Sequence, residues 1–198
     1  MSARPLRLGA DAVAALLPHR PPFLLVDRVD DFDPAPQPTL RARRAISVNE
    51  PVFAGHFPGM MLWPGVYTIE GMGQACQLLV TWLAVSEGFA RAGLTDDDAV
   101  AALRSLDGRQ RFRSGATSPH ADLLRDGLGE PASRVGVSAA VDVRLIEPVF
   151  AGDVVRYEVS LTHTRDAVRR FDVRADVDGA PVARGTMTAA VLHARRGP

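Results

Sequence analysis

The sequence predicts an α+β domain in which one long central helix is wrapped by a twisted antiparallel sheet of five to six strands. Two patterns carry this prediction: a long apolar segment with helical spacing in the first half of the chain, and a regular alternation of apolar and polar residues in the last third. With 198 residues, 46% of them hydrophobic and 23% charged, the chain is long enough to bury a sizeable core. We therefore expect a single domain over residues 1–198.

The long helix is expected to begin near Pro64, because proline lacks the N–H that the first turn leaves unpaired and its fixed φ suits a helix. Two polar side chains, Glu70 and Gln74, interrupt its apolar surface, and their i, i+4 spacing stacks one above the other. Desolvating an unpaired carboxylate is costly, so Glu70 is either paired or poised to act as an acid. The apolar face recurs at spacings of three and four: Val66, Ile69, Gly73, Cys76, Val80 and Leu83.

A loop rich in glycine and proline carries one histidine, His56, before this helix and fourteen residues before Glu70. If the loop folds back, it brings a base that is active near neutral pH close to a candidate acid and a helix N-terminus. The free N–H groups of that N-terminus can hold a developing oxyanion, and Gly65 is the first candidate because it has no side chain to obstruct approach. The alternative is that Glu70 only bonds Gln74 and faces a wet interface.

The other elements are expected to be strands. Residues 155–161 and 171–177 alternate apolar with polar side chains, which is typical of half-buried antiparallel strands. Asp178 and Gly179 are a two-residue hairpin signal before a closing strand over residues 182–192. Three more strands are expected over residues 23–29, 40–48 and 135–146.

Two segments are expected to lie outside this core. Residues 1–10 are predicted to be loose, and residues 93–134 to be an inserted helical and loop segment at the surface. Thr95 and the three aspartates after it can cap a helix within the insert. The sharpest local charge of the insert comes from Arg109, Arg111 and Arg113, and a solvated loop is preferred there over a docking patch for an acidic partner.

The composition excludes several classes of function. Lysine plus arginine and aspartate plus glutamate both number 23, so no net charge recruits nucleic acid or a membrane. The single cysteine, Cys76, cannot form an internal disulfide and is expected to pack in the core. No Cys/His spacing suits a metal, and nothing resembles a signal peptide or a membrane span, so we expect a cytoplasmic protein without a metal site.

Three ordered motifs resemble one known family. They are HFPG with the PG, Glu and Gln that follow it (residues 56–59, 64, 65, 70 and 74), LPHRPPFLLVDR (residues 17–28) and EPVFAGD (residues 147–153). Together they are similar to the FabZ-type (3R)-3-hydroxyacyl-[acyl-carrier-protein] dehydratases, whose fold is the hot-dog fold. The similarity covers roughly residues 16–87 and 135–192.

The resemblance implies a role for each candidate residue. His56 would be the catalytic histidine that takes the C2 proton, and Glu70 the catalytic carboxylate that protonates the leaving 3-hydroxyl. The Gly65 amide would donate to the thioester carbonyl, and Gln74 would orient Glu70. The loop before the helix differs from the smaller loop of the family, so its residues are candidates for lining the acyl route. The candidate substrate-binding residues are Phe57, Met61, Trp63 and Gln74.

The resemblance further implies reversible dehydration of a (3R)-3-hydroxyacyl thioester to the trans-2-enoyl thioester, in fatty-acid or polyketide-like biosynthesis. The substrate would travel on the phosphopantetheine arm of an acyl carrier protein, with no cofactor in the enzyme itself. A homodimer that shares each site between two chains is also implied. The alternatives are a non-catalytic hot-dog subunit, which binds acyl thioesters or completes a heterodimer, and a hot-dog thioesterase whose carboxylate activates water.

Overall fold

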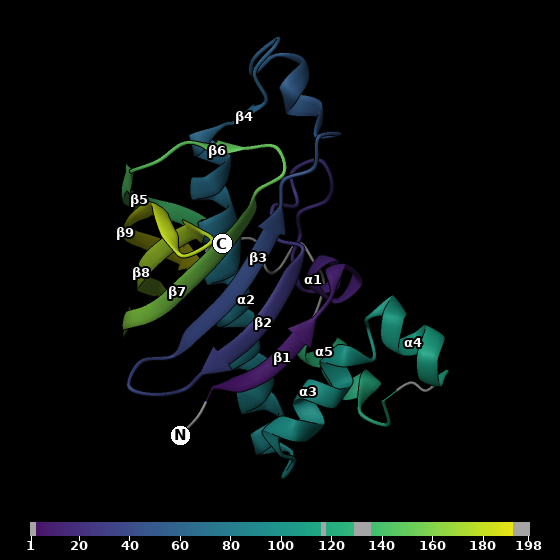
Figure 1. The fold of residues 1–198 in the computed structure, drawn as a ribbon. Coiled ribbons are helices and arrows are strands. Elements are labelled where there is room, and N and C mark those ends of the chain that lie inside the picture. Colours follow the sequence, from purple (N-terminus) through teal and green to yellow (C-terminus); the bar gives the residue numbers. More distant parts are fainter. Residues whose placement is uncertain (1–2, 116–117, 129–135, 192–198) are drawn as a thin grey trace, which may run out of the picture.

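The computed structural model describes residues 3–115, 118–128 and 136–191. Its main layer is a seven-stranded antiparallel sheet in the order β1-β2-β3-β7-β8-β9-β5, and the sheet curves around one long helix, α2 (Gly65–Arg91) (Figure 1). The strands of this sheet are β1 (Arg4–Leu8), β2 (Arg28–Asp33), β3 (Thr39–Ala45), β5 (Gly136–Leu145), β7 (Val154–Arg165), β8 (Val168–Val177) and β9 (Ala180–Val191).

Smaller elements surround this layer. A two-stranded ribbon lies near the start of α2 and joins β4 (Leu62–Trp63) to β6 (Val149–Phe150) (Figure 1). The short helices are α1 (Ala10–Leu16), the 3-10 helix η1 (Pro51–Ala54), α3 (Asp96–Arg104), α4 (Gly108–Ser114) and α5 (Ala121–Leu128). In the part of the chain that the structure describes, no helix is both long and apolar enough to cross a membrane.

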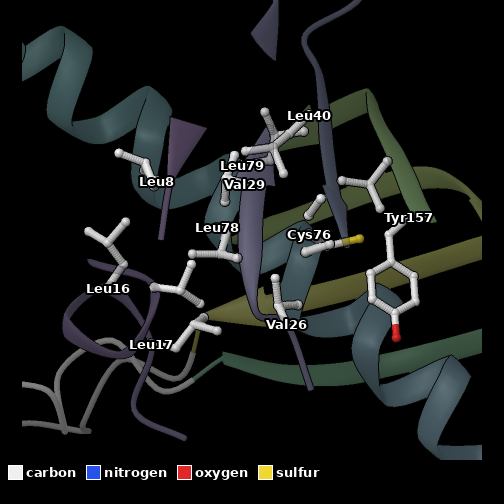
Figure 2. Packing of buried hydrophobic residues seen from close by; sticks show 14 of the residues in the cluster. Leu8, Leu16, Leu17, Val26, Val29, Leu40, Cys76, Leu78, Leu79 and Tyr157 are labelled. Atoms are coloured by element: carbon white, nitrogen blue, oxygen red, sulfur yellow. The ribbon is translucent and has the colours of Figure 1, made fainter. Parts of the chain in front are cut away.

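Helix α2 is the spine of the domain, as the sequence predicts. Pro64 is its N-cap and Gly65 its first helical residue. Its buried side packs against the inner face of the sheet (Figure 2), but of the predicted apolar face only Cys76 is buried, and Val66 is exposed. Gly71 marks the closest approach, because a Cβ on this residue would lie 2.3 Å from the hydroxyl of Tyr157 on β7. Tyr157 is fully buried, and that burial raises the pKa of its hydroxyl.

The strands of the last third follow the predicted alternation. Residues 155, 157 and 159 of β7 and residues 171, 173 and 175 of β8 are buried, while their neighbours face outward. Asp178 and Gly179 have φ angles of 51° and 86°, as a two-residue turn with two positive φ values requires. Among the described strands, β5 is the edge beside β9, and nearly all of its residues are exposed. Val135 and Leu192, the expected ends of two strands, lie outside the described residues.

The prediction of a loose N-terminus is wrong for residues 4–10, and residues 1 and 2 lie outside the described residues. Residues 4–8 form β1, which pairs with β2 and buries Leu6 and Leu8 completely. The side chain of Arg104 on α3 donates to the carbonyl oxygens of Leu6 and Pro5, at 2.9 and 2.8 Å. These bonds hold β1 on the side away from β2. With β1 included, the sheet has seven strands instead of the expected five or six.

The expected strand over residues 23–29 begins only at Arg28. Leu24, Leu25 and Val26 are buried, but the backbone of Phe23 and Leu25 bonds the side chain of Gln74 instead of a neighbouring strand. Apolar residues can be buried equally well in a strand and in an extended segment that packs across a helix. The pattern therefore located the burial correctly and the hydrogen bonding incorrectly.

The expected surface insert over residues 93–134 is helical in its described part, but it does not lie wholly on the surface. Thr95 caps α3 through a reciprocal bond with Asp98, as predicted, and α3 buries four residues: Ala99, Val100, Ala102 and Leu103. Helix α4 is joined to α1 by two backbone N–H groups, Gly9 to Asp107 at 2.6 Å and Gly108 to Asp11 at 2.9 Å. The first part of the insert therefore belongs to the core.

Candidate active site

His56 lies in a loop after η1 and lines a cavity of about 230 Å³ at the start of α2. Its ring is stacked on Phe57, with the ring centroids 4.1 Å apart, and its Nδ1 lies 2.9 Å from the carbonyl oxygen of Leu62. A carbonyl oxygen only accepts hydrogen bonds, so Nδ1 must carry the proton. This leaves Nε2 as the basic nitrogen of the ring.

Gly65 lines the same cavity, at the first turn of α2. The N–H groups of a first turn have no acceptor within the helix, and no side chain of the N-cap bonds them here. Leu145 of β5 packs against Gly65 so closely that a Cβ on residue 65 would lie 2.4 Å from its Cδ1. A larger residue at this position would displace the Leu145 side chain, and the helix dipole adds partial positive charge to the cavity.

Glu70 lines a second and larger cavity of about 570 Å³, together with Gln74 and His19. Gln74 is 1% exposed and all of its amide is bonded. Its Oε1 accepts from Leu25 N–H at 2.8 Å, so its Nε2 must face the other way, where it donates to Phe23 O at 2.8 Å and to Glu70 Oε1 at 3.0 Å. Gln74 thereby fixes one carboxylate oxygen of Glu70.

His19 is the residue at this site that the sequence reasoning missed. Its Nε2 lies 3.5 Å from Glu70 Oε1, and its buried Nδ1 has no hydrogen-bond partner among the described residues. The Glu70 side chain is 34% exposed in the single chain. His19 stands within the LPHRPPFLLVDR motif, so the motif held the signal, but spacing alone gave no reason to place residue 19 beside residue 70.

Within one chain, His56 and Glu70 line different cavities. Five helical residues separate Gly65 from Glu70, which turns the two side-chain positions about 140° apart around the axis of α2. The structure therefore brings His56 together with Gly65, and Glu70 together with Gln74. The two pairs lie on different sides of the first turns of α2.

The candidate substrate-binding residues differ in their surroundings. Trp63 is 2% exposed, lines the His56 cavity and packs edge-on against Phe53 and Tyr67, with centroid distances of 6.2 and 5.2 Å. Phe57 and Met61 are 45% and 48% exposed, and neither lines the two cavities. Within the described ranges, no group of three His, Cys, Asp or Glu side chains could hold a metal ion.

A long helix wrapped by a curved antiparallel sheet defines a hot-dog protein. A dehydratase heterocomplex, ApeI:P from Xenorhabdus doucetiae, has the same fold, with a TM-score of 0.56 over 92% of this chain and 91% of that chain and 16% sequence identity. The FabA-like domain family matches residues 17–104, which contain both pairs of candidate residues.

Curated relatives are similar over nearly the whole chain. The 3-hydroxyacyl-[acyl-carrier-protein] dehydratase FabZ of Cronobacter sakazakii is 34% identical, and the FabZ of Erwinia tasmaniensis is 33% identical, each over 92% of this chain and 92% of its own. This chain therefore belongs to the FabA-like hot-dog family that contains the FabZ dehydratases.

Proposed function

We propose that this protein is a 3-hydroxyacyl-[acyl-carrier-protein] dehydratase. One observation carries the proposal: His56, with Nε2 as its basic nitrogen, lies beside a helix N-terminus without a side-chain cap from Pro64, and a carboxylate held by Gln74 follows about one and a half turns further on. These are the parts that elimination of water next to a thioester needs. The curated relatives that match 92% of the chain bear the name of this activity.

The reaction removes one proton and one hydroxide from neighbouring carbons. His56 Nε2 takes the proton from C2, and the negative charge moves to the thioester oxygen, where the Gly65 N–H and the helix dipole stabilise it. Glu70, in its protonated form, gives its proton to the 3-hydroxyl, which leaves as water while the C2–C3 double bond forms. One proton enters His56 and one leaves Glu70, so solvent exchange restores both groups.

We infer that each complete site lies between two copies of the chain. His56 and Glu70 line separate cavities in one chain, so a second chain is needed to bring the two roles to one substrate. Strand β5 is suited to the contact, because it is a free edge with exposed apolar residues such as Val137, Val141 and Leu145. An unpaired apolar edge strand is a template for pairing with another chain.

The partner that delivers the substrate is an acyl carrier protein, whose phosphopantetheine arm carries the acyl group. No step of the proposed reaction calls for a metal or an organic cofactor, because every proton and charge is handled by His56, Glu70 and Gly65. The acyl group belongs to fatty-acid or polyketide-like biosynthesis.

One assay tests the proposal. The protein is incubated with a (3R)-3-hydroxybutyryl carrier-protein thioester, and the enoyl thioester is measured against free acid. Enoyl product is expected, and the His56→Ala and Glu70→Gln variants should each lose about a hundredfold or more in rate, since a single general acid or base contributes about that much. Free acid as the product would indicate a thioesterase, and no conversion would indicate a binding subunit.

A further inference from the structure

The larger cavity continues far beyond Glu70. Its wall on α2 runs from Glu70 to Val85, which is about 22 Å along a helix with a rise of about 1.5 Å per residue. Polar groups gather at the Glu70 end, where His19 and Gln74 also face the cavity. The wall further along is mostly apolar or small and includes Val80, Ala84, Val85, Val137, Ala189 and Ala190. Arg169, which pairs with Ala189 across β8 and β9, is a charged residue that also lines it.

The direction of this cavity follows from the strand register. Leu145, the last residue of β5, packs against Gly65 at the start of α2. Val137 lies eight residues earlier in the same strand, about 27 Å away at about 3.4 Å per residue. It lines the cavity with Val85, so β5 and α2 run antiparallel and the cavity leads away from Gly65 toward the C-terminal end of α2.

Helix α5 lies at that far end. The ring of His120, one residue before α5, is 6.0 Å from the ring of Phe89 near the end of α2, and Leu124 of α5 is fully buried. Figure 1 shows α5 beside α3, next to the lower part of α2. Gly127 and Leu128, at the end of α5, line the cavity that Glu70 opens into.

Resting on the proposed dehydratase function, we propose that α5 forms the distal wall of the groove for the acyl chain and that Leu128 limits the length of the chain. The C3 hydroxyl faces Glu70 at the polar end of the cavity, so carbons from C4 onward enter its mostly apolar part, which leads along α2 toward α5. The far end of the cavity then meets the tail of the acyl group. There, a change of one methylene in fit alters kcat/KM by about tenfold or more.

Changing the volume of residue 128 tests this assignment. The variants are Leu128→Ala and Leu128→Phe, assayed with 3-hydroxybutyryl, 3-hydroxyoctanoyl and 3-hydroxypalmitoyl thioesters on one carrier protein. We expect Leu128→Ala to raise the palmitoyl to octanoyl ratio of kcat/KM by about tenfold, and Leu128→Phe to lower it by about as much. The butyryl value should stay within about twofold, because its short chain ends near Glu70.

Leu123→Ala is the matched control. Leu123 stands on the same helix, is half-buried and packs against the same core, but it does not line the cavity. It should lower thermal stability as Leu128→Ala does and leave the chain-length ratio unchanged.

The assays distinguish failure of the proposed dehydratase function from failure of the role assigned to α5 and Leu128. If the wild-type protein does not dehydrate the butyryl thioester, the proposed function fails first. If it does, and a folded Leu128 variant keeps the wild-type chain-length ratio, or Leu123→Ala moves the ratio equally, then α5 does not set the length. Because Ala and Phe change the volume in opposite directions, one folded variant is enough to overturn the assignment.

Discussion

At the scale of single residues, Gln74 decides how Glu70 is held. A glutamine amide has one acceptor end and one donor end, and here the backbone of Leu25 occupies the acceptor. The donor end therefore faces Phe23 O and Glu70 Oε1. The opposite orientation of the amide would place its oxygen against an oxygen at both contacts. The extended segment over residues 23–26 is thus part of the support of the carboxylate.

Gln74→Ala should weaken both stability and catalysis. It leaves the buried N–H of Leu25 without its partner, which costs about 1–3 kcal/mol of unfolding free energy. It also frees Glu70 to rotate, so kcat should fall by about tenfold or more while KM changes little. Thermal unfolding and steady-state kinetics check the two parts. A stability loss with unchanged kcat would show that Gln74 supports the segment alone.

Cys76 gives a prediction about pH. It is buried, and burial raises the pKa of its thiol far above the ordinary value of about 8.5. In the unfolded chain the thiol ionises near its ordinary pKa, while in the folded chain it stays protonated. The raised pKa therefore stabilises the fold fully below about pH 8.5, and that stability is lost as pH rises above it.

The measurement is a comparison of wild-type protein with Cys76→Ala between pH 7 and pH 10. The wild type should lose up to about 1.4 kcal/mol more unfolding free energy per pH unit above pH 8.5 than the variant does. The native thiol should also resist a thiol reagent that modifies the urea-unfolded chain at once. Equal slopes for the two proteins would mean that Cys76 ionises freely in the fold.

At the scale of elements, two glycines of α2 serve opposite purposes. A Cβ on Gly71 would lie 2.3 Å from the Tyr157 hydroxyl, and Tyr157 is enclosed by the core, so neither residue can move aside. Among the described residues, no atom beyond its chain neighbours and its own helix backbone lies within 4 Å of a Cβ on Gly88. The same helix therefore contains one glycine that packing requires and one that packing does not.

Alanine at these positions should move stability in opposite directions. Gly71→Ala overpacks the core and should cost about 1–3 kcal/mol or more. Gly88→Ala gains helix propensity and should stabilise by up to about 1 kcal/mol. Chemical unfolding of the two variants gives both values, and a destabilised Gly88→Ala together with a neutral Gly71→Ala would contradict the packing described for α2.

The elements that the sequence predicted well are those whose apolar pattern repeats over enough residues to be recognised. Helix α2 and strands β7 to β9 repeat their pattern over ten residues or more. Strand β1 has only five residues, which are too few for the sequence pattern to identify it as a strand. Its outer side is bonded by Arg104, which lies about a hundred residues away in sequence and could not be paired with it by pattern.

At the scale of the whole molecule, the candidate site could be predicted residue by residue but not as a geometry. The motif gave His56, Gly65, Glu70 and Gln74, and helix periodicity alone set Gln74 next to Glu70. The contact of His19 with Glu70 joins two chain segments fifty residues apart, and no local pattern encodes it. The separation of His56 from Glu70 depends on how the loop before α2 folds.

That separation leads to a test of the shared site. His56→Ala and Glu70→Gln chains, each inactive alone, are mixed in equal amounts and refolded together. Random pairing makes roughly half of the dimers mixed, and one site of each mixed dimer then contains both lesions while the other site is intact. About a quarter of wild-type activity should return if the site is shared, and none if each chain has its own site.

In a second mixture, the model with separate sites predicts the higher activity. Wild-type chain is refolded with an equal amount of the double variant His56→Ala/Glu70→Gln. With shared sites, every site of a mixed dimer lacks one group, so only wild-type dimers work and about a quarter of the activity of an all-wild-type sample remains. With separate sites, each wild-type chain works regardless of its partner and about half remains. Half-activity here, with no rescue in the first mixture and chain exchange verified by mass, would place the whole site within one chain.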